Sequence, residues 1–506
     1  MPPISLIKRN IIANFAGSIW MALMSLVFIP LYIHFTGIEA YGLVGFYATL
    51  QGVFALLDMG LSSTLNREMA GLSAEVGREQ EMRNMVRTLE FIYWGVAVAI
   101  VVVIVLLSGY ISQHWVTAEH LSPETVREAV ILMGIATGLQ WPVSFYSGGL
   151  MGLQGQVLLN VVNIIMATLR GVGAVLILWL VSPTIGAFFS WQIVVSGTTT
   201  LLLAGALWYS MPKSRGKACF QASVLRRIWR FAVGMFGISL LATLLTQMDK
   251  IILSRMLPLE MFGYYTLSGV VALSLFRLIG PIFNGVYPRL TQLVTLNDQF
   301  AIKELYHRSC QVMSLMILPA AFVLAFFSRE LLLLWTQNVV TAERAYLLVS
   351  LLVTGTALNG LMNIPYALQL AHGWTKLAFY VNLVSVIILF PLIFFMTKHY
   401  GAVGGASVWV ILNSGYVLIT IQLMHRRLLP DEKMYWYGRD VGLPLLCAVV
   451  TAGCGRILMP DSLSQLGVVF YIAVVSLLTF GFAAWVTPET RRWIVQRLSY
   501  RTVKCV

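Results

Sequence analysis

Charged side chains inside long apolar stretches are the residues of this sequence most able to do chemistry. Arg170 and Arg277 each lie near the middle of a predicted membrane-spanning stretch, one in each half of the chain. A charge at the bilayer centre costs at least about 2.5 kcal/mol, so such a residue usually faces a cavity or a partner. Two such arginines can form a cationic floor for an anionic substrate. The alternative is that each pairs with a carboxylate or extends toward the membrane surface.

Among the other charged residues within predicted spans, three are candidates for function: Lys250, Asp58 and Asp249. Lys250 is predicted to help bind the substrate, and the alternative is that its long side chain extends outward. Asp58 and Asp249 are predicted to couple transport to a proton or sodium ion, or to act as a gate. The alternative for each aspartate is a structural bond to a neighbouring helix or arginine.

Asparagines also occur inside the predicted spans. Polar side chains in membrane helices either join neighbouring helices by hydrogen bonds or line a polar path. Both interpretations, helix joints and contacts to sugar hydroxyls, stay open for Asn160, Asn163, Asn359, Asn363, Asn382 and Asn413.

Motifs of catalysis are missing from the sequence. It holds no phosphate-binding Gly-Lys-Ser/Thr loop, no His-Glu-x-x-His pair and no nucleophile elbow. The five cysteines fit no metal or redox spacing. The outer loops are too short to form a catalytic domain. We therefore expect a transporter rather than an enzyme, with no cofactor and no metal.

The composition is that of an integral membrane protein. Of 506 residues, 58% are hydrophobic and 11% are charged, whereas a soluble domain carries roughly 25% charged residues. The formal net charge of +13 fits the Lys and Arg that collect in cytoplasmic loops, rather than nucleic-acid binding.

Apolar runs long enough to cross a bilayer recur along the whole chain. They predict an all-α membrane fold of about 14 transmembrane helices. The first run follows Lys8 and Arg9 and is too long for a signal peptide. The predicted spans are 10–35, 42–66, 88–111, 127–152, 157–181, 184–209, 229–256, 263–288, 307–328, 345–370, 376–398, 402–425, 440–459 and 466–487.

The basic residues are distributed unequally between the two sides of the membrane. With an even number of spans, most Lys and Arg residues fall in the loops on the side of the N-terminus, for example Arg78, Arg83, Lys217 and Arg426. Basic loops stay in the cytoplasm. The pattern predicts a multi-pass protein of the cytoplasmic (inner) membrane with both termini in the cytoplasm.

Two segments of the sequence are echoed later in the chain. The turn at 37–42 resembles that at 258–263, and 183–191 resembles 401–409. The two offsets are nearly equal and predict a duplicated six-helix unit. The expected organisation is an N-lobe over 1–211, a C-lobe over 212–430, and two more helices with a basic tail over 431–506. A binding site is expected between the lobes.

The chain resembles the polysaccharide transporters of the multidrug/oligosaccharidyl-lipid/polysaccharide exporter superfamily, which include O-antigen flippases. The resemblance is carried by 37–42 with 56–62, and by 247–253 with 260–265. It implies two six-helix lobes around a central cavity and two extra C-terminal helices. It also implies flipping of undecaprenyl-diphosphate-linked sugars by alternating access, with Arg170 and Arg277 matching the cavity arginines that hold phosphates in related flippases.

A flippase for lipid-linked oligosaccharide, such as an O-antigen or exopolysaccharide repeat unit, is the leading functional prediction. The expected partners are that substrate, membrane lipids, and the polymerase and glycosyltransferases of polysaccharide synthesis. A cation-coupled exporter of small drugs or metabolites is the alternative, in which the acidic residues bind the substrate. A membrane enzyme such as a glycan polymerase or ligase is a third reading, and would need essential residues on the outer loops.

Overall fold

The computed structural model describes residues 4–73, 75, 77–214 and 216–487. Over these ranges the chain forms helices and short connections, with a single isolated bridge between Thr117 and Pro258. The prediction of an all-α membrane fold is confirmed. The basic tail lies outside the described residues.

Among the described residues, 11 segments are long and apolar enough to span a membrane. Two of them, Ile12–Asp58 and Thr375–Leu428, are 47 and 54 residues long, about twice what one crossing needs. Each contains a glycine with non-helical backbone angles, Gly37 (φ 82°) and Gly401 (φ 57°), where two helices meet. The count of fourteen spans stays a prediction.

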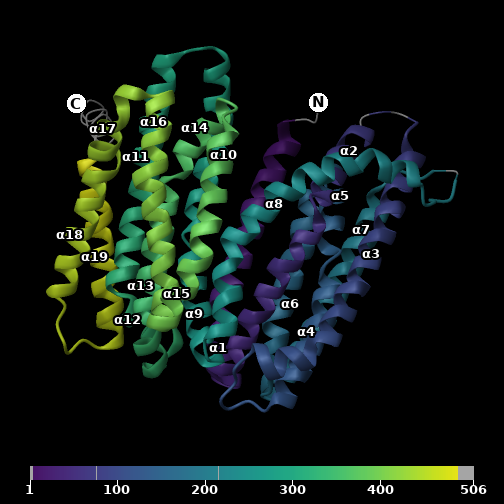
Figure 1. The fold of residues 1–506 in the computed structure, drawn as a ribbon, viewed down its shortest axis with the longest axis horizontal. Coiled ribbons are helices and arrows are strands. Elements are labelled where there is room, and N and C mark those ends of the chain that lie inside the picture. Colours follow the sequence, from purple (N-terminus) through teal and green to yellow (C-terminus); the bar gives the residue numbers. More distant parts are fainter. Residues whose placement is uncertain (1–3, 74, 76, 215, 488–506) are drawn as a thin grey trace, which may run out of the picture. The chain divides into compact units, whose positions relative to one another are not determined.

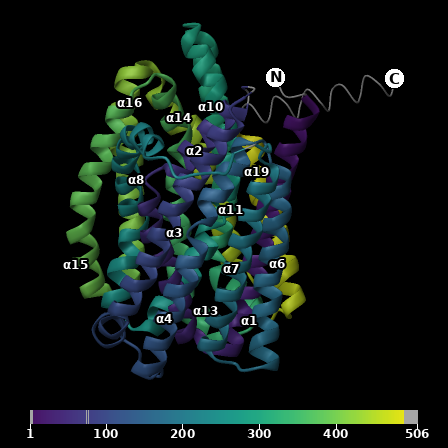
Figure 2. The same cartoon turned by 90° about the vertical axis from the view of Figure 1, so that its right-hand side faces the viewer.

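The chain divides into two compact units, Met1–Gly263 and Tyr264–Val506. The three-part division predicted from the repeat stays a prediction. In the first unit α1 packs on α6, α4 packs on α3 and α7, and α2 packs on α5, as the nearly parallel helices of Figure 2 illustrate. The elements that begin in this unit are α1 (Ile4–Phe54), η1 (Ala55–Asp58), α2 (Leu61–Ser73), α3 (Glu79–Tyr110), η2 (Ile111–Trp115), α4 (Pro123–Gln140), α5 (Val143–Gly152), α6 (Gln156–Leu180), α7 (Ile185–Ser210), α8 (Ala222–Met256) and α9 (Leu259–Leu273).

In the second unit α13 packs on α11 and α15, α10 packs on α14, and α11 also packs on the adjacent pair α18 and α19, drawn in yellow-green to yellow in Figure 1. The elements of this unit are α10 (Phe276–Thr295), α11 (Gln299–Phe326), α12 (Ser328–Thr336), α13 (Val339–Leu361), α14 (Asn363–Ala371), α15 (Thr375–Gly415), η3 (Tyr416–Thr420), α16 (Ile421–Leu428), η4 (Pro430–Glu432), α17 (Lys433–Tyr435), η5 (Trp436–Gly442), α18 (Leu443–Ile457) and α19 (Gln465–Val486).

Large apolar side chains cover the outside of both units. Leu106 is 77% exposed, Phe390 59% and Leu477 74%, which would be unfavourable in water but is what a helix needs against lipid. The interior holds buried polar residues as well, among them Gln192 and Asn413. This distribution is that of a membrane protein with polar interior paths.

The two turns that echo one another in sequence also contact one another in the first unit. A Cβ atom at Gly42 would lie 2.3 Å from the carbonyl oxygen of Leu259, and one at Gly263 would lie 2.4 Å from that of Ile38. The two contacts are reciprocal. They require glycine, because any side chain at either position would overlap the opposite backbone.

A cluster of charged residues ties the C-terminal helices to α11. His307 on α11 bonds Asp440 at 2.5 Å and Glu432 at 3.2 Å, and Lys303 pairs with Glu432 at 2.7 Å. Gln311 donates a hydrogen bond to the other oxygen of Asp440 at 2.9 Å, and Asp440 is fully buried. The five residues make up what we call the α11 clasp.

Candidate substrate site

The first unit contains a polar cavity of about 480 Å³ beside a break in the membrane helix that follows Gly37. The break runs over η1 and ends at Met59 and Gly60, whose φ angles are 47° and 72°. Non-helical backbone at membrane depth is tolerated where it lines a cavity or is buried in protein. The cavity is lined by Gln51, Ala55, Asp58, Ser62, Thr137, Gln140, Trp141, Val143, Ser144 and Arg170.

Asp58 stabilises this break. Its carboxylate accepts hydrogen bonds from the Tyr93 hydroxyl at 2.5 Å, from the Ser62 hydroxyl at 2.8 Å and from the Ser144 hydroxyl at 3.4 Å. The Trp141 indole donates to the carbonyl oxygen of Phe54, at the end of α1, at 3.1 Å. Asp58 is thus a lining residue of the cavity with a structural role in its wall.

Arg170 lies in the same cavity on α6, where it is half-buried. Its guanidinium donates a hydrogen bond to the Gln140 side chain at 2.9 Å. It forms no salt bridge within the described ranges, although the Asp58 carboxylate lines the same space. The cavity therefore contains a cation whose nearest bonded partner is a neutral amide.

Lys250 and Asp249 are half-buried on α8, in the same unit. Lys250 donates to the Gln247 side chain at 3.4 Å, and Gln247 lies against Gly52 of α1, within 2.8 Å of where a Cβ would be. Residues three apart share a helix face, so Lys250 lies on the side of α8 that faces α1. Neither Lys250 nor Asp249 lines the cavity that holds Arg170.

Arg277 belongs to the second unit, in the first turn of α10 just after the turn that separates α9 from α10. A cation at a helix N-terminus opposes the helix dipole. The helix therefore gains nothing from Arg277. Its side chain is exposed and makes no ion pair with any residue that the structure describes.

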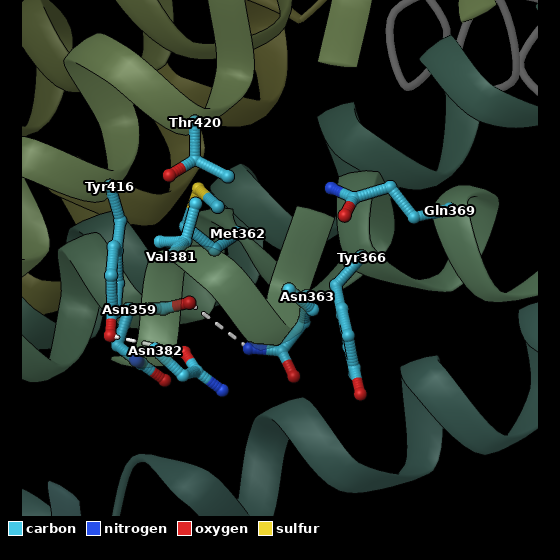
Figure 3. Close-up of a pocket in the computed structure, with 10 residues that line it drawn as sticks. Asn359, Met362, Asn363, Tyr366, Gln369, Val381, Asn382, Tyr416 and Thr420 are labelled. Carbon is cyan, nitrogen blue, oxygen red and sulfur yellow. Dashed lines mark hydrogen bonds between the residues drawn. The ribbon is translucent and has the colours of Figure 1, made fainter. Parts of the chain in front are cut away.

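The second unit holds a cavity of about 260 Å³ with a different chemistry, shown in Figure 3. Every side chain around it is uncharged. It lies where α13, α14, α15 and η3 meet, and Asn359, Asn363 and Asn382 all contribute to it. We call it the amide cavity; its other lining residues are Met362, Tyr366, Gln369, Ala378, Val381, Tyr416 and Thr420.

Two of the other asparagines in the predicted spans join helices. Asn160 donates to Asn14 at 2.6 Å, which links α6 to α1. Asn413 accepts from Asn359 at 2.8 Å, which links α15 to α13. The helix-joint interpretation is confirmed for Asn160 and Asn413, whereas Asn359 both joins helices and lines a cavity.

Sequence reasoning missed most of the neutral residues around Arg170. Gln140, Trp141 and Ser144 come from the region of the predicted fourth span, and their only signal was the breaker Pro142 between α4 and α5. Tyr93 gave no signal of its own. Neutral polar residues in a span are common, so their grouping shows only when the helices are packed.

Long apolar helices, a broken span and polar cavities among the helices define this protein as a multi-pass membrane transporter. The chain belongs to the polysaccharide biosynthesis protein family, whose model matches residues 7–294. It is similar to the putative O-antigen transporter of Shigella flexneri, with 20% identity over 377 residues, or 74% of this chain and 87% of that relative. The resemblance drawn from the sequence motifs is confirmed.

Solved structures of transporters share the fold. The lipid II flippase MurJ in its inward closed conformation matches with a TM-score of 0.70 and 13% identity, over 96% of this chain and 99% of that one. An inward-facing multidrug resistance MATE family transporter of the MOP superfamily matches with a TM-score of 0.61 and 13% identity, over 83% and 94%. These relatives are transporters and flippases rather than enzymes, and this protein too is a transporter rather than an enzyme.

Proposed function

We propose that the protein is a flippase that moves undecaprenyl-diphosphate-linked oligosaccharide across the cytoplasmic membrane by alternating access. Family membership supports a transporter of polysaccharide synthesis. The duplicated turns, with their reciprocal glycine contacts, support two related lobes that move relative to one another. The lobes are 1–211 and 212–430, and 431–506 adds the last two helices.

The observation that carries the proposal is the state of Arg170. It is half-buried in a cavity within the membrane-spanning part, and Asp58, the carboxylate in that cavity, is engaged by Tyr93 and Ser62 instead. A buried cation that lacks a counter-charge is costly. An anionic ligand removes this cost, and a pyrophosphate offers a guanidinium several charged acceptors.

The substrate is amphiphilic, and its three parts need three environments. Arg170 is the main contact of the pyrophosphate. Lys250 and Arg277 contact it at other steps of the transport cycle. The glycan occupies polar space inside the protein, and the polyprenyl tail stays in the bilayer. In this proposal the protein lies in the inner membrane with both termini in the cytoplasm. Reporter fusions at the two ends would test this orientation.

Complementation of a flippase-deficient strain tests the proposal. Wild type is compared with Arg170→Ala and Arg277→Ala at matched membrane expression. Loss of a charge-assisted hydrogen bond costs about 1.5–3 kcal/mol, which is roughly a 10- to 150-fold loss of affinity. Surface polysaccharide should fall strongly in both variants. Arg127→Ala and Arg344→Ala are matched controls, because both arginines are exposed near helix starts, and both should complement.

The outcomes separate the alternatives. If wild type complements and the Arg170 variant does too, the flippase stands and the pyrophosphate site is wrong. If wild type fails with a panel of lipid-linked donors, the cation-coupled exporter becomes the better account. That alternative is favoured by Asp58, a carboxylate on the cavity wall, and it predicts that Arg170→Ala leaves export of cationic drugs intact.

The polymerase and the glycosyltransferases of polysaccharide synthesis are proposed as protein partners. Crosslinking in cells would test these contacts.

A further inference from the structure

The amide cavity of the second unit is built for a ligand that is polar and uncharged. None of the residues around it carries a charge, so neither an anion nor a cation would find a partner. Most of them carry an amide or a hydroxyl, and these come from α13, α14, α15 and η3. In membrane helices, neutral polar side chains either bond to one another across helices or face a polar cavity.

The hydrogen bonds inside the cavity leave much of its capacity unused. Asn363 donates to the backbone oxygen of Asn359 at 3.0 Å, so its own side-chain oxygen is left as an acceptor. Asn382 accepts from the Tyr416 hydroxyl at 3.4 Å, so its NH₂ group is left as a donor. A side-chain amide always offers both an acceptor and two donors. The cavity therefore presents acceptors and donors close together.

Gln369 contributes an amide that faces the cavity and has its hydrogen-bonding groups available. Its side chain is 2% exposed, and its amide makes no hydrogen bond to any residue that the structure describes. In Figure 3 this amide points toward the space between Thr420 and Asn363. The amide faces the open space of the cavity, so a polar ligand or water can complete its hydrogen bonds there.

An aromatic surface adjoins the amides. The ring of Tyr366, which lines the cavity, stacks on Phe283 with centroids 6.4 Å apart, and Phe283 stacks on Tyr287 at 5.8 Å. Tyr366 remains 38% exposed. Aromatic rings give large apolar contact areas with a polar edge. They suit the face of a sugar ring, which carries C–H groups between its hydroxyls.

From these contacts we infer that the amide cavity binds sugar residues of the lipid-linked glycan. Each sugar hydroxyl is a donor and an acceptor, as is each amide, so the two pair in either direction. Gln369, Asn363 and Asn382 are the hydrogen-bonding residues, and Tyr366 is the ring contact. The inference rests on the proposed flippase function, and it assigns glycan recognition to the second unit.

An adjoining groove favours a lipid-linked sugar over a free one. An apolar groove of about 410 Å³ shares Val381, Tyr416 and Thr420 with the amide cavity and is otherwise lined mainly by apolar residues of α15. Ile388, which lines this groove, is 55% exposed. An amphiphile can place its sugar on the amides while its apolar part runs along the groove. A free sugar would leave the groove empty.

Binding to the full chain in lipid nanodiscs tests the inference. The probes are undecaprenyl diphosphate, a panel of undecaprenyl diphosphates carrying one or two sugars, and the same free sugars. The quantity of interest is the glycan increment, which is the ratio of the Kd of the bare carrier to the Kd of the tightest glycosylated one. Gln369→Leu should lower this increment roughly tenfold, because two neutral hydrogen bonds are lost. It should leave the Kd of the bare carrier unchanged.

Three further variants complete the design. Tyr416→Phe removes a hydroxyl that lines the cavity and that positions Asn382 by a hydrogen bond, and it should lower the increment several-fold. This variant tests the inference if Gln369→Leu does not fold. Gln465→Leu, a matched substitution at an exposed position of α19, should change nothing. Arg170→Ala should weaken binding of both the bare and the glycosylated carriers, which leaves the increment intact.

The inference is overturned if folded Gln369→Leu and Tyr416→Phe both keep the wild-type increment, or if no glycan binds wild type more tightly than the bare carrier. It is also overturned if free sugars bind as tightly as their lipid-linked forms. A wild type that binds no undecaprenyl diphosphate at all, with or without sugar, contradicts the proposed function itself. If only the sugar site is wrong, the wild type still binds undecaprenyl diphosphate and Arg170→Ala still weakens that binding.

Discussion

Gly42 and Gly263 occupy equivalent places in two contacting turns, and each lies against the backbone opposite the other. The carbonyl of Leu259 approaches Gly42, and that of Ile38 approaches Gly263. Gly42 and Gly263, like Ile38 and Leu259, are 221 residues apart, the offset of the echo between 37–42 and 258–263. The duplication predicted from the sequence would produce reciprocity of this kind. The contact holds helices together by close backbone packing rather than by side chains.

This contact predicts opposite effects for two similar substitutions in α9. Gly263→Ala should destabilise the protein by about 1–3 kcal/mol, because its Cβ overlaps a carbonyl oxygen. Gly269→Ala should be neutral or stabilise it by up to about 1 kcal/mol, since alanine favours helix and a Cβ there meets nothing within 4 Å. Thermal unfolding of the purified variants measures both. Equal melting temperatures for the two variants would contradict the close contact.

The hydroxyl of Tyr93 is predicted to stabilise the break beside Asp58. Tyr93→Phe removes its bond to the carboxylate and should cost about 1.5–3 kcal/mol, the usual range for a hydrogen bond to a charged group. Tyr209→Phe is the matched control, because Tyr209 is 91% exposed. Thermal unfolding in one detergent compares them. If Tyr93→Phe has the same melting temperature as wild type, this bond does not stabilise the break beside Asp58.

Ion coupling through the aspartates can be tested by removing both charges. The double variant Asp58→Asn, Asp249→Asn should transport at a rate that no longer responds to an imposed proton or sodium gradient. Asparagine keeps the hydrogen bonds from Tyr93 and Ser62 within reach, so the cavity wall should persist. Flipping in proteoliposomes with and without each gradient is the measurement. A double variant that still follows either gradient would exclude both aspartates as the coupling site.

The α11 clasp should show strong coupling between His307 and Asp440. His307→Leu leaves a fully buried carboxylate with Gln311 as its remaining partner, and removing one member of a buried pair costs about 3–5 kcal/mol. The double variant His307→Leu, Asp440→Leu should be destabilised by less than the sum of the two single substitutions. A double-mutant cycle from thermal unfolding gives the coupling energy. Additive effects would mean that the two residues do not depend on each other.

Much of the fold could be predicted from apolar run lengths, because a bilayer demands about twenty apolar residues for each crossing. The sequence also marked Gly37 and Gly401, since each follows a long apolar run and lies in an echoed turn. It could not show that only the glycine departs from helical backbone angles in each turn. That feature depends on how tightly two helices pack, which hydropathy does not record.

The candidate site was predictable only in part. Arg170 and Asp58 stand out because a charge in a span is unusual, and the structure places both on one cavity. Gln140 and Gln369 carry no such signal, although each lines a cavity. Whether an asparagine joins helices or faces a cavity depends on which neighbour it meets, as Asn160 and Asn382 show.

The glycine turn at Gly37 also bears on how the protein is made. Membrane proteins are inserted while the ribosome is still translating them, and a polar loop normally gives the first span time to settle before the next emerges. Here the second half of α1 follows Gly37 at once, and the polar residues of the turn, such as Thr36 and Glu39, belong to the two helices themselves. The first two predicted spans should therefore enter the bilayer as a pair rather than one after the other.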